Sequence, residues 1–193
     1  MSLIETKEDL LKDLHSDDNI DHTSLNSMVA GETKYLRDLR INLKNVITSE
    51  FISVKEAYLL ALSIAVNERN RPLISSFTAL AMENGATDAE IAEIHACTSL
   101  LSVNNVFYRF RHFAGKESYN TMPARIKMTI MMNPVLGKEF FELVSLAVSA
   151  VNGCEMCVKS HEASLVSLGT KEERIFDAVR IASVVRGLSQ VVN

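Results

Sequence analysis

Two cysteines separated by two residues, Cys154 and Cys157, are the side chains best suited to chemistry in this chain, and His161 follows four positions after the second. A thiol pair at this spacing either cycles between dithiol and disulfide or supplies half of a metal site. On a helix, positions three and four apart share one face, so the imidazole lies one turn beyond the thiols. The pattern indicates thiol redox chemistry with a group at hand that can exchange protons.

The residues before the pair indicate a turn into a new helix. Asn152 is a residue type that caps helices, and Gly153 permits a tight turn, which would place Cys154 in the first helical turn. Unpaired backbone N–H groups and the helix dipole favour a thiolate at that end of a helix. We therefore expect a reactive thiol here.

The segment before the turn is apolar apart from a thin polar stripe of Glu142, Ser145 and Ser149. A helix that is apolar nearly all round is usually buried. If this helix and the next form an antiparallel hairpin that turns at Asn152, Glu142 and His161 lie nearly level, because each residue adds about 1.5 Å of rise. Carboxylate, imidazole and thiol could then form a proton relay, with Glu142 raising the basicity of His161.

Other readings of the cysteine pair are a half zinc site or two unrelated core cysteines. The sequence holds no second Cys-x-x-Cys and no His-x₃₋₅-His to complete a tetrahedral site, and Cys97 is a single thiol in a helical pattern. A thioredoxin-like site would need a strand before the pair, where this chain has a long apolar helix. We expect no metal and no tightly bound cofactor.

Apolar residues recur at the helical period, and only 7 Gly and 3 Pro interrupt the 193 residues. The chain is therefore predicted to be all-α, with residues 1–34 as a polar N-terminal extension that holds one short helix and the acidic run Asp17-Asp18-Asn19, and residues 35–193 as a single helical domain. The expected helices are approximately residues 35–48, 53–68, 72–84, 87–104, 138–151, 153–168 and 171–190.

The two halves of this domain resemble each other at an offset of about 85 residues, over approximately 53–110 and 138–193. Residues 63–67 and 148–152 both close an apolar helix with Asn, and a Gly follows the next helix in each half. This favours a duplicated helical unit with chemistry in the second copy only. The alternative, that any two amphipathic hairpins look alike, stays open at this point.

Composition limits the cellular setting and the partners. The net charge of −4 gives no reason to expect nucleic acid or an anionic membrane surface as a partner. The N-terminus lacks the pattern of a signal peptide, and no apolar run reaches the length of a membrane span. Three cysteines cannot complete a disulfide framework, so we expect a cytoplasmic protein.

With these residues in hand, the chain resembles the alkyl hydroperoxidase D family within the carboxymuconolactone decarboxylase-like group. The family pattern is a Glu, eleven residues, a Cys, two residues, a Cys, three residues and a His, which Glu142, Cys154, Cys157 and His161 fit at every spacing. The resemblance covers about residues 35–193, including the segments 104–109 and 147–154. It implies an all-α fold with a duplicated core that assembles as a homo-trimer or a higher homo-oligomer.

The resemblance also implies the role of each residue in a hydroperoxide reductase. Cys157 would attack the peroxide and become a sulfenic acid, Cys154 would be the resolving thiol and proton donor, His161 the proton shuttle and Glu142 the relay carboxylate. Dihydrolipoamide on a lipoyl-bearing protein would be the reductant, and a peroxiredoxin the partner. Some relatives carry a second His between the cysteines where this chain has Met156, so no role for that His carries over.

Three other functions compete with a peroxidase. An adaptor that passes electrons from dihydrolipoamide to a partner peroxiredoxin would need the same dithiol. A carboxymuconolactone-type decarboxylase would have no use for the dithiol, and a non-catalytic helical interaction protein would leave the four-residue pattern unexplained. Arg109, Arg111 and His112 form a basic cluster that could meet an acidic substrate or reductant, although a solvated surface explains it more simply.

Overall fold

The structure is a computed structural model that describes residues 1–16 and 21–193. In these residues it consists of α-helices and one short 3-10 helix, η1 (Thr129–Met131), with no strand, which confirms the predicted all-α class. The α-helices are α1 (Leu3–Asp13), α2 (Thr23–Ala30), α3 (Tyr35–Ile47), α4 (Val54–Asn67), α5 (Arg71–Glu83), α6 (Asp88–Ala114), α7 (Glu117–Thr121), α8 (Lys138–Val151), α9 (Glu155–Ser167) and α10 (Glu172–Leu188).

The main departures from the predicted helices lie at the N-terminus and in α6. Residues 1–34 hold two helices where one short helix was expected, and the acidic run Asp17-Asp18-Asn19 lies outside the described residues. The α6 helix continues ten residues past its expected end at residue 104 and stops at Ala114. It stops there because Gly115 adopts the left-handed conformation that ends helices, with φ of 59°.

Local capping explains several helix starts. Ser53 and Glu56 form a reciprocal capping box at the start of α4, and Thr87 and Glu90 form another at the start of α6. Each box satisfies backbone N–H groups that have no partner within the helix.

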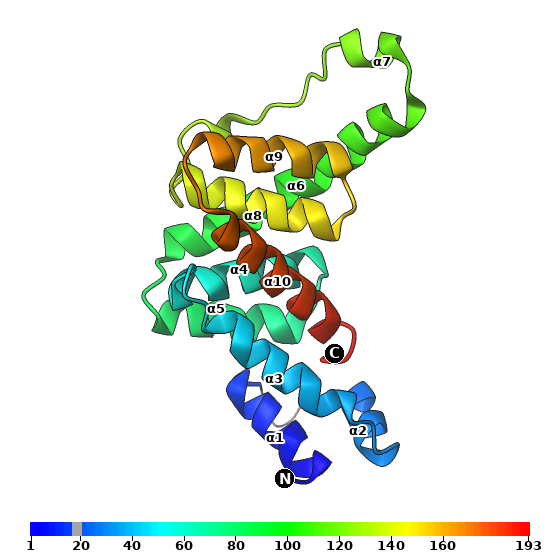
Figure 1. Cartoon of the computed structure of the whole chain (residues 1–193), viewed down its shortest axis with the longest axis vertical. Helices are drawn as coiled ribbons and strands as arrows, with labels where there is room; N and C mark the ends of the chain where they lie inside the picture. Colours follow the sequence, from blue (N-terminus) through cyan, green and yellow to red (C-terminus); the bar gives the residue numbers. More distant parts are fainter. Residues whose placement is uncertain (17–20) are drawn as a thin grey trace.

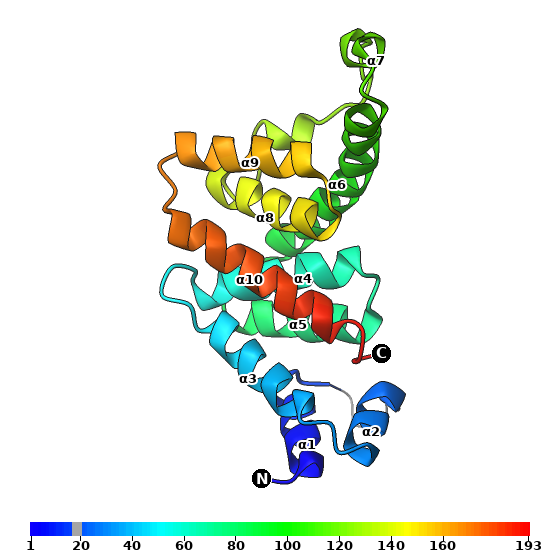
Figure 2. The same cartoon turned by 45° about the vertical axis from the view of Figure 1, so that its right-hand side comes forward.

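The helices pack around two central members, α4 and α8. Both are buried over most of their length, α8 at every position from Phe140 to Ser149, as its apolar sequence predicts. Figures 1 and 2 show α10 between the α4–α5 hairpin and the α8–α9 hairpin, and α10 packs against both α4 and α8. The end of α6 and α7 project from this body, at the opposite end from α1 and α2. None of the helices in the described residues is long and apolar enough to cross a membrane.

The N-terminal helices join the main core. Leu10 and Leu14 from the α1 region and Leu25 from α2 are buried in the same cluster as the residues of α4 and α8. The α1 helix packs directly on α3. The division of the chain at residue 34 stays a prediction.

The bounds of the two hairpins match at a constant offset. The α8 and α9 helices begin and end 84 residues after α4 and α5, and α10 begins 84 residues after α6. The packing also matches, since α4 contacts α5 and α6 while α8 contacts α9 and α10. The duplication itself stays a prediction, but the offset makes corresponding positions of the two hairpins directly comparable.

A network of amides joins the ends of the two hairpins. The side chains of Asn67 and Asn152 exchange two hydrogen bonds, of 3.0 and 3.1 Å. Asn152 also donates to Asn105, which donates in turn to Ser149 on α8. Asn105 is buried and the other two amides are half-buried, so their pairing favours one arrangement of α4, α6 and α8.

Candidate active site

The hairpin of α8 and α9 brings Glu142 and His161 together, as their spacing from the turn predicts. Nδ1 of His161 lies 2.7 Å from Oε2 of Glu142, and both side chains are buried. A carboxylate only accepts hydrogen bonds, so Nδ1 carries the proton and donates it to the bond. This leaves Nε2 of His161 as the ring nitrogen that can exchange a proton with another group.

Cys154 and Cys157 lie at the start of α9 and form a disulfide in the structure, with their Cα atoms 5.3 Å apart. Cys154 is fully buried and Cys157 is 6% exposed. Cys154 is the N-cap residue, one position before the first helical turn in which it was expected. Gly153, with φ of 67°, makes the left-handed turn between the two helices.

The prediction that Asn152 caps the second helix is wrong. Asn152 ends α8 as its C-cap, and its amide is used by Asn67 and Asn105 instead. Within residues 1–16 and 21–193, no side chain caps the N-terminus of α9. The backbone N–H groups of its first turn, including that of Cys157, are therefore available to stabilise negative charge on sulfur.

Cys157 and His161 open onto one cavity of about 340 Å³. Its walls come from α6, α9 and the segment around η1, and the lining residues are Asn104, Tyr108, Met128, Met131, Met156, Cys157, Ser160 and His161. The three thioethers make much of this wall apolar and adaptable in shape. Sequence reasoning missed Met128 and Met131, which carry no spacing signal, whereas Asn104 and Tyr108 lie in a segment that the family resemblance had already singled out.

Glu142 has a second cationic neighbour that sequence reasoning also missed. Nζ of Lys138 lies 2.8 Å from Oε1 of Glu142, one helical turn earlier on α8. Burial raises the pKa of the Glu142 carboxyl, but the hydrogen bonds and charges of His161 and Lys138 outweigh it and hold that pKa below its ordinary value. Glu142 is therefore an ionised carboxylate at neutral pH.

The third cysteine, Cys97, differs sharply from the pair. It is fully buried on α6, with its sulfur 3.7 Å from the hydroxyl of Ser145. Burial raises the pKa of the Cys97 thiol to about 12, so it stays protonated and is a poor nucleophile.

The basic cluster of Arg109, Arg111 and His112 has intramolecular partners. Arg109 donates to the backbone carbonyl of Asn152, and Arg111 donates to that of Met122. His112 lies 3.5 Å from the Glu155 carboxylate. Arg109 thus supports the turn between α8 and α9.

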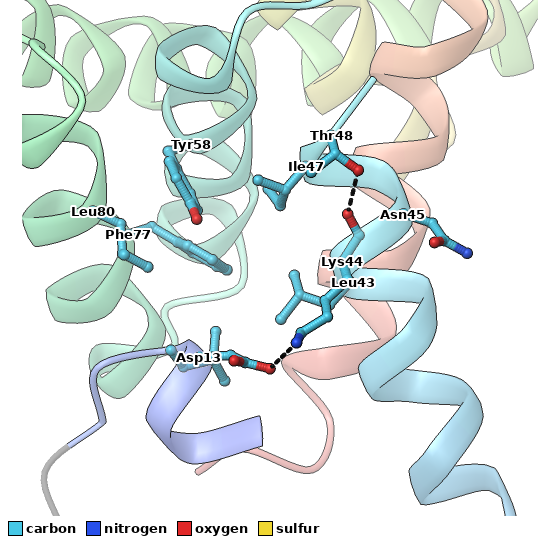
Figure 3. A pocket seen from close by; sticks show the side chains of 10 residues that line it. Asp13, Leu43, Lys44, Asn45, Ile47, Thr48, Tyr58, Phe77 and Leu80 are labelled. Atoms are coloured by element: carbon cyan, nitrogen blue, oxygen red, sulfur yellow. Dashed lines mark hydrogen bonds and ion pairs between the residues drawn. The ribbon is translucent and has the colours of Figure 1, made fainter. Parts of the chain in front are cut away.

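The first hairpin carries a cavity of similar size and different chemistry. It measures about 320 Å³ and lies between α1, α3, α4 and α5. Figure 3 shows Tyr58, Phe77 and Leu80 on one side of it, with Lys44 reaching Asp13 on the other. Tyr58 and Phe77 occupy the positions 84 residues before Glu142 and His161.

Fold and site together define an all-α protein with a buried Cys-x-x-Cys pair beside a carboxylate and an imidazole. The sequence profile of the Carboxymuconolactone decarboxylase family matches residues 118–193. The chain is 39% identical over 155 residues to the alkyl hydroperoxide reductase AhpD of Rhodopseudomonas palustris, covering 80% of this chain and 85% of that protein. It is 41% identical over 149 residues to AhpD of Anaeromyxobacter dehalogenans (77% and 80%) and 38% identical over 160 residues to AhpD of Coxiella burnetii (81% and 90%).

These similarities extend over most of both chains. The protein therefore belongs to the alkyl hydroperoxide reductase AhpD family.

Proposed function

We propose that this protein reduces organic hydroperoxides with Cys154 and Cys157, using His161 and Glu142 as a proton relay. The observation that carries the proposal is that Cys157 and His161 face one cavity while Nδ1 of His161 is bonded to the buried Glu142. The relatives named alkyl hydroperoxide reductase support the same reaction.

In the first step the thiolate of Cys157 attacks the terminal oxygen of the hydroperoxide. An S–O bond forms and the O–O bond breaks, which gives a sulfenic acid on Cys157 and an alkoxide. His161 donates a proton from Nε2 to the alkoxide, and the neighbouring Glu142 carboxylate stabilises the imidazolium that carries this proton. The sulfur of Cys157 is oxidised by two electrons and the peroxide is reduced by two. One peroxide oxygen leaves in the alcohol, and the other stays on Cys157 as the sulfenic acid.

In the second step Cys154 resolves the sulfenic acid. Its sulfur attacks the sulfur of Cys157, so that the S–S bond forms, the S–O bond breaks and water leaves with the proton of the Cys154 thiol. The short distance between the two cysteines supports this resolving step, because a neighbouring thiol traps a sulfenic acid before further oxidation. Hydroperoxide and dithiol thus yield alcohol, water and disulfide.

A dithiol such as dihydrolipoamide then restores the pair by thiol–disulfide exchange. Cys154 is fully buried and Cys157 nearly so, and of the two cysteines Cys157 lines the cavity. A slim lipoyl arm fits such an opening better than the surface of a folded protein does. This favours the peroxidase over the adaptor, whose disulfide substrate would lie on a partner peroxiredoxin.

The test is the rate of peroxide consumption with dihydrolipoamide, free or on a lipoyl-bearing protein, as the sole reductant. We expect turnover without any peroxiredoxin, and the same turnover in Cys97→Ser. Consumption that requires an added peroxiredoxin would instead establish the adaptor. If neither the hydroperoxide nor an oxidised peroxiredoxin oxidises the dithiol, both the peroxidase and the adaptor are overturned.

We also propose that the chain forms a homo-trimer or a higher homo-oligomer in the cytoplasm. The projecting part of α6 exposes four large apolar side chains, Val103, Val106, Phe110 and Phe113, at spacings that place them on one face. An exposed apolar stripe of this kind is typical of an interface between copies. Multi-angle light scattering on the wild type and on Phe113→Glu tests this, since the variant should shift to smaller species.

A further inference from the structure

Lys138 and His161 divide the two oxygens of Glu142 between them. Nζ of Lys138 lies 2.8 Å from Oε1, while Nδ1 of His161 lies 2.7 Å from Oε2. Lys138 is half exposed, whereas the carboxylate that it contacts is buried. The relay carboxylate therefore has a counterion on the solvent side as well as a partner on the side of the dithiol.

Lys138 also reaches the wall of the cavity. Its Nζ donates a 3.3 Å hydrogen bond to the backbone carbonyl of Met131, whose side chain lines the cavity beside Cys157. The same segment is held a few residues later by Glu93, which accepts hydrogen bonds from the backbone N–H groups of Val135 and Leu136. Lys138 thus connects the proton relay with the segment that shapes the substrate cavity.

We propose that Lys138 is a positioning residue that keeps Glu142 ionised and oriented toward His161. The inference rests on the proposed function, because it concerns the same relay. Lys138 itself touches neither the thiols nor, on this account, the substrate.

The charges around Glu142 support this role. The titratable groups that face it are Lys138 on its own helix, His161 on α9, and Cys97 on α6, where the buried Glu93 also lies. Glu139, the next residue after Lys138, is turned to Arg174 on α10. Among the described residues, Lys138 is thus the lysine or arginine that pairs with Glu142. Because the carboxylate is buried, loss of Lys138 should make its charged form less favourable.

The sign of the effect follows from these contacts. Removing Lys138 removes one of the two partners that lower the pKa of Glu142, while burial continues to raise it. The pKa of Glu142 should therefore rise in Lys138→Met. As the pH falls, the carboxyl should then become protonated, and the relay be lost, at a higher pH than in the wild type. Lys138→Arg keeps the charge and should restore the wild-type behaviour.

Two readouts on the full-length protein test the proposal. The first is the ¹³C NMR titration of the Glu142 side-chain carboxyl in protein labelled at glutamate, assigned by comparison with Glu142→Gln. The second is the pH profile of peroxide turnover, where Lys138→Met should lower the rate by about two- to fivefold at neutral pH, the size of a partly exposed ion pair, and more on the acidic side. Circular dichroism checks that each variant is folded.

Lys159→Met is the matched control, because it removes the same charge from an exposed pair with Glu155 on α9. We expect its Glu142 titration to equal that of the wild type. An unchanged titration in Lys138→Met, or the same upward shift in Lys138→Arg or Lys159→Met, would overturn the proposal. Failure of the proposed function would appear separately, as absence of turnover in the wild type, while the titration would still decide the role of Lys138.

Discussion

The hairpins α4–α5 and α8–α9 have the same lengths and the same connection, yet only the second combines ionisable groups with thiols. Where the second hairpin pairs Glu142 with His161, the first packs Tyr58 against Phe77, with ring centroids 6.4 Å apart and the rings tilted by 33°. Tyr58 and Phe77 both line one cavity, and His161 lines another of similar volume. One backbone arrangement therefore holds a packed aromatic pair in one half and, in the other, the residues to which we assign the chemistry.

The helix starts show the same contrast. In the first hairpin the side chain of Asn70 accepts a hydrogen bond from the N–H of Leu73 and so caps α5. The corresponding positions in the second hairpin are Cys154 and Cys157, and the N-cap Cys154 makes no side-chain capping bond to α9. A capping side chain stabilises a helix by about 1 kcal/mol, and α9 lacks one where, on the proposed function, its N–H groups stabilise a thiolate.

The largest expected effect separates the three cysteines. Cys157→Ser should abolish peroxide turnover because the nucleophile is gone, and Cys154→Ser should stop catalytic cycling after one oxidation. Cys97→Ser should leave the rate within about twofold, because a buried thiol whose pKa is raised to about 12 takes no part. Steady-state rates of the three variants check this, and equal losses at Cys97 and Cys157 would contradict it.

The second prediction concerns the relay. Glu142→Gln should lower turnover by about 10²–10⁴-fold, the usual size of a general acid–base contribution, with little loss of folding. Adding His161→Gln should cost little more, because residues that act as one unit are non-additive. A double-mutant cycle on the peroxide reduction rate measures the coupling. If the two losses multiply, Glu142 and His161 are not one relay.

The corresponding position in the first hairpin should respond through stability. Phe77 is fully buried, so Phe77→Ala should lower the free energy of unfolding by about 3–5 kcal/mol, the cost of removing a core aromatic ring. The rate per folded molecule should stay close to that of the wild type. Urea unfolding and active-site titration separate the two quantities. A large rate loss in the folded fraction would show that the first half contributes to the chemistry.

The smallest expected effect concerns an ion pair whose charges are exchanged between the halves. Lys55 pairs with Glu90 in the first half, and Glu139 pairs with Arg174 at the corresponding positions of the second. Lys55→Met should cost about 0.2–1 kcal/mol, the usual size of an ion pair that is partly open to solvent. Arg174→Met should cost more in urea unfolding, because Arg174 also binds Glu56 and is mostly shielded from solvent.

The pH dependence of stability gives a second test of the role of Arg174. Burial raises the pKa of Glu56, but its bonds to Arg174 and Ser53 outweigh burial and lower it. A carboxyl whose pKa is lowered by folding stabilises the protein above its unfolded pKa, and that contribution is lost as the pH falls through its folded pKa. Arg174→Met should therefore weaken the loss of stability on the acidic side of pH 4.5. An unchanged acid dependence would contradict this role for Arg174.

Much of the fold was predictable because local signals agree with the packing. The bounds of α4 and α8 lie within about one residue of expectation, since capping at Ser53 and burial of the apolar run in α8 act on the same segments. The end of α6 was not predictable in this way. Its last turns expose Phe110 and Phe113, so the helical period does not report a buried face there.

The site residues also differ in whether local sequence signals could predict them. Spacing on one hairpin was sufficient to place Glu142 level with His161, and His161 one helical turn beyond Cys157, because all four residues belong to the two helices that meet at Asn152. Met128 and Met131 come from an irregular segment whose path depends on tertiary contacts with Glu93. Lys138 could have been found from the sequence, since it lies four residues before Glu142 on the same predicted helix face.

The assignment of Cys157 as the nucleophile is tested most directly by finding which cysteine receives the oxygen from one equivalent of an alkyl hydroperoxide. Reduced Cys154→Ser is mixed with the peroxide and a sulfenic acid trap, and the labelled residue is identified by mass spectrometry. We predict one trapped sulfenic acid per chain, on Cys157, formed more slowly when Glu142→Gln is added. Trapping on Cys97, or no trapping at Cys157, would contradict the assignment of chemistry to the second hairpin.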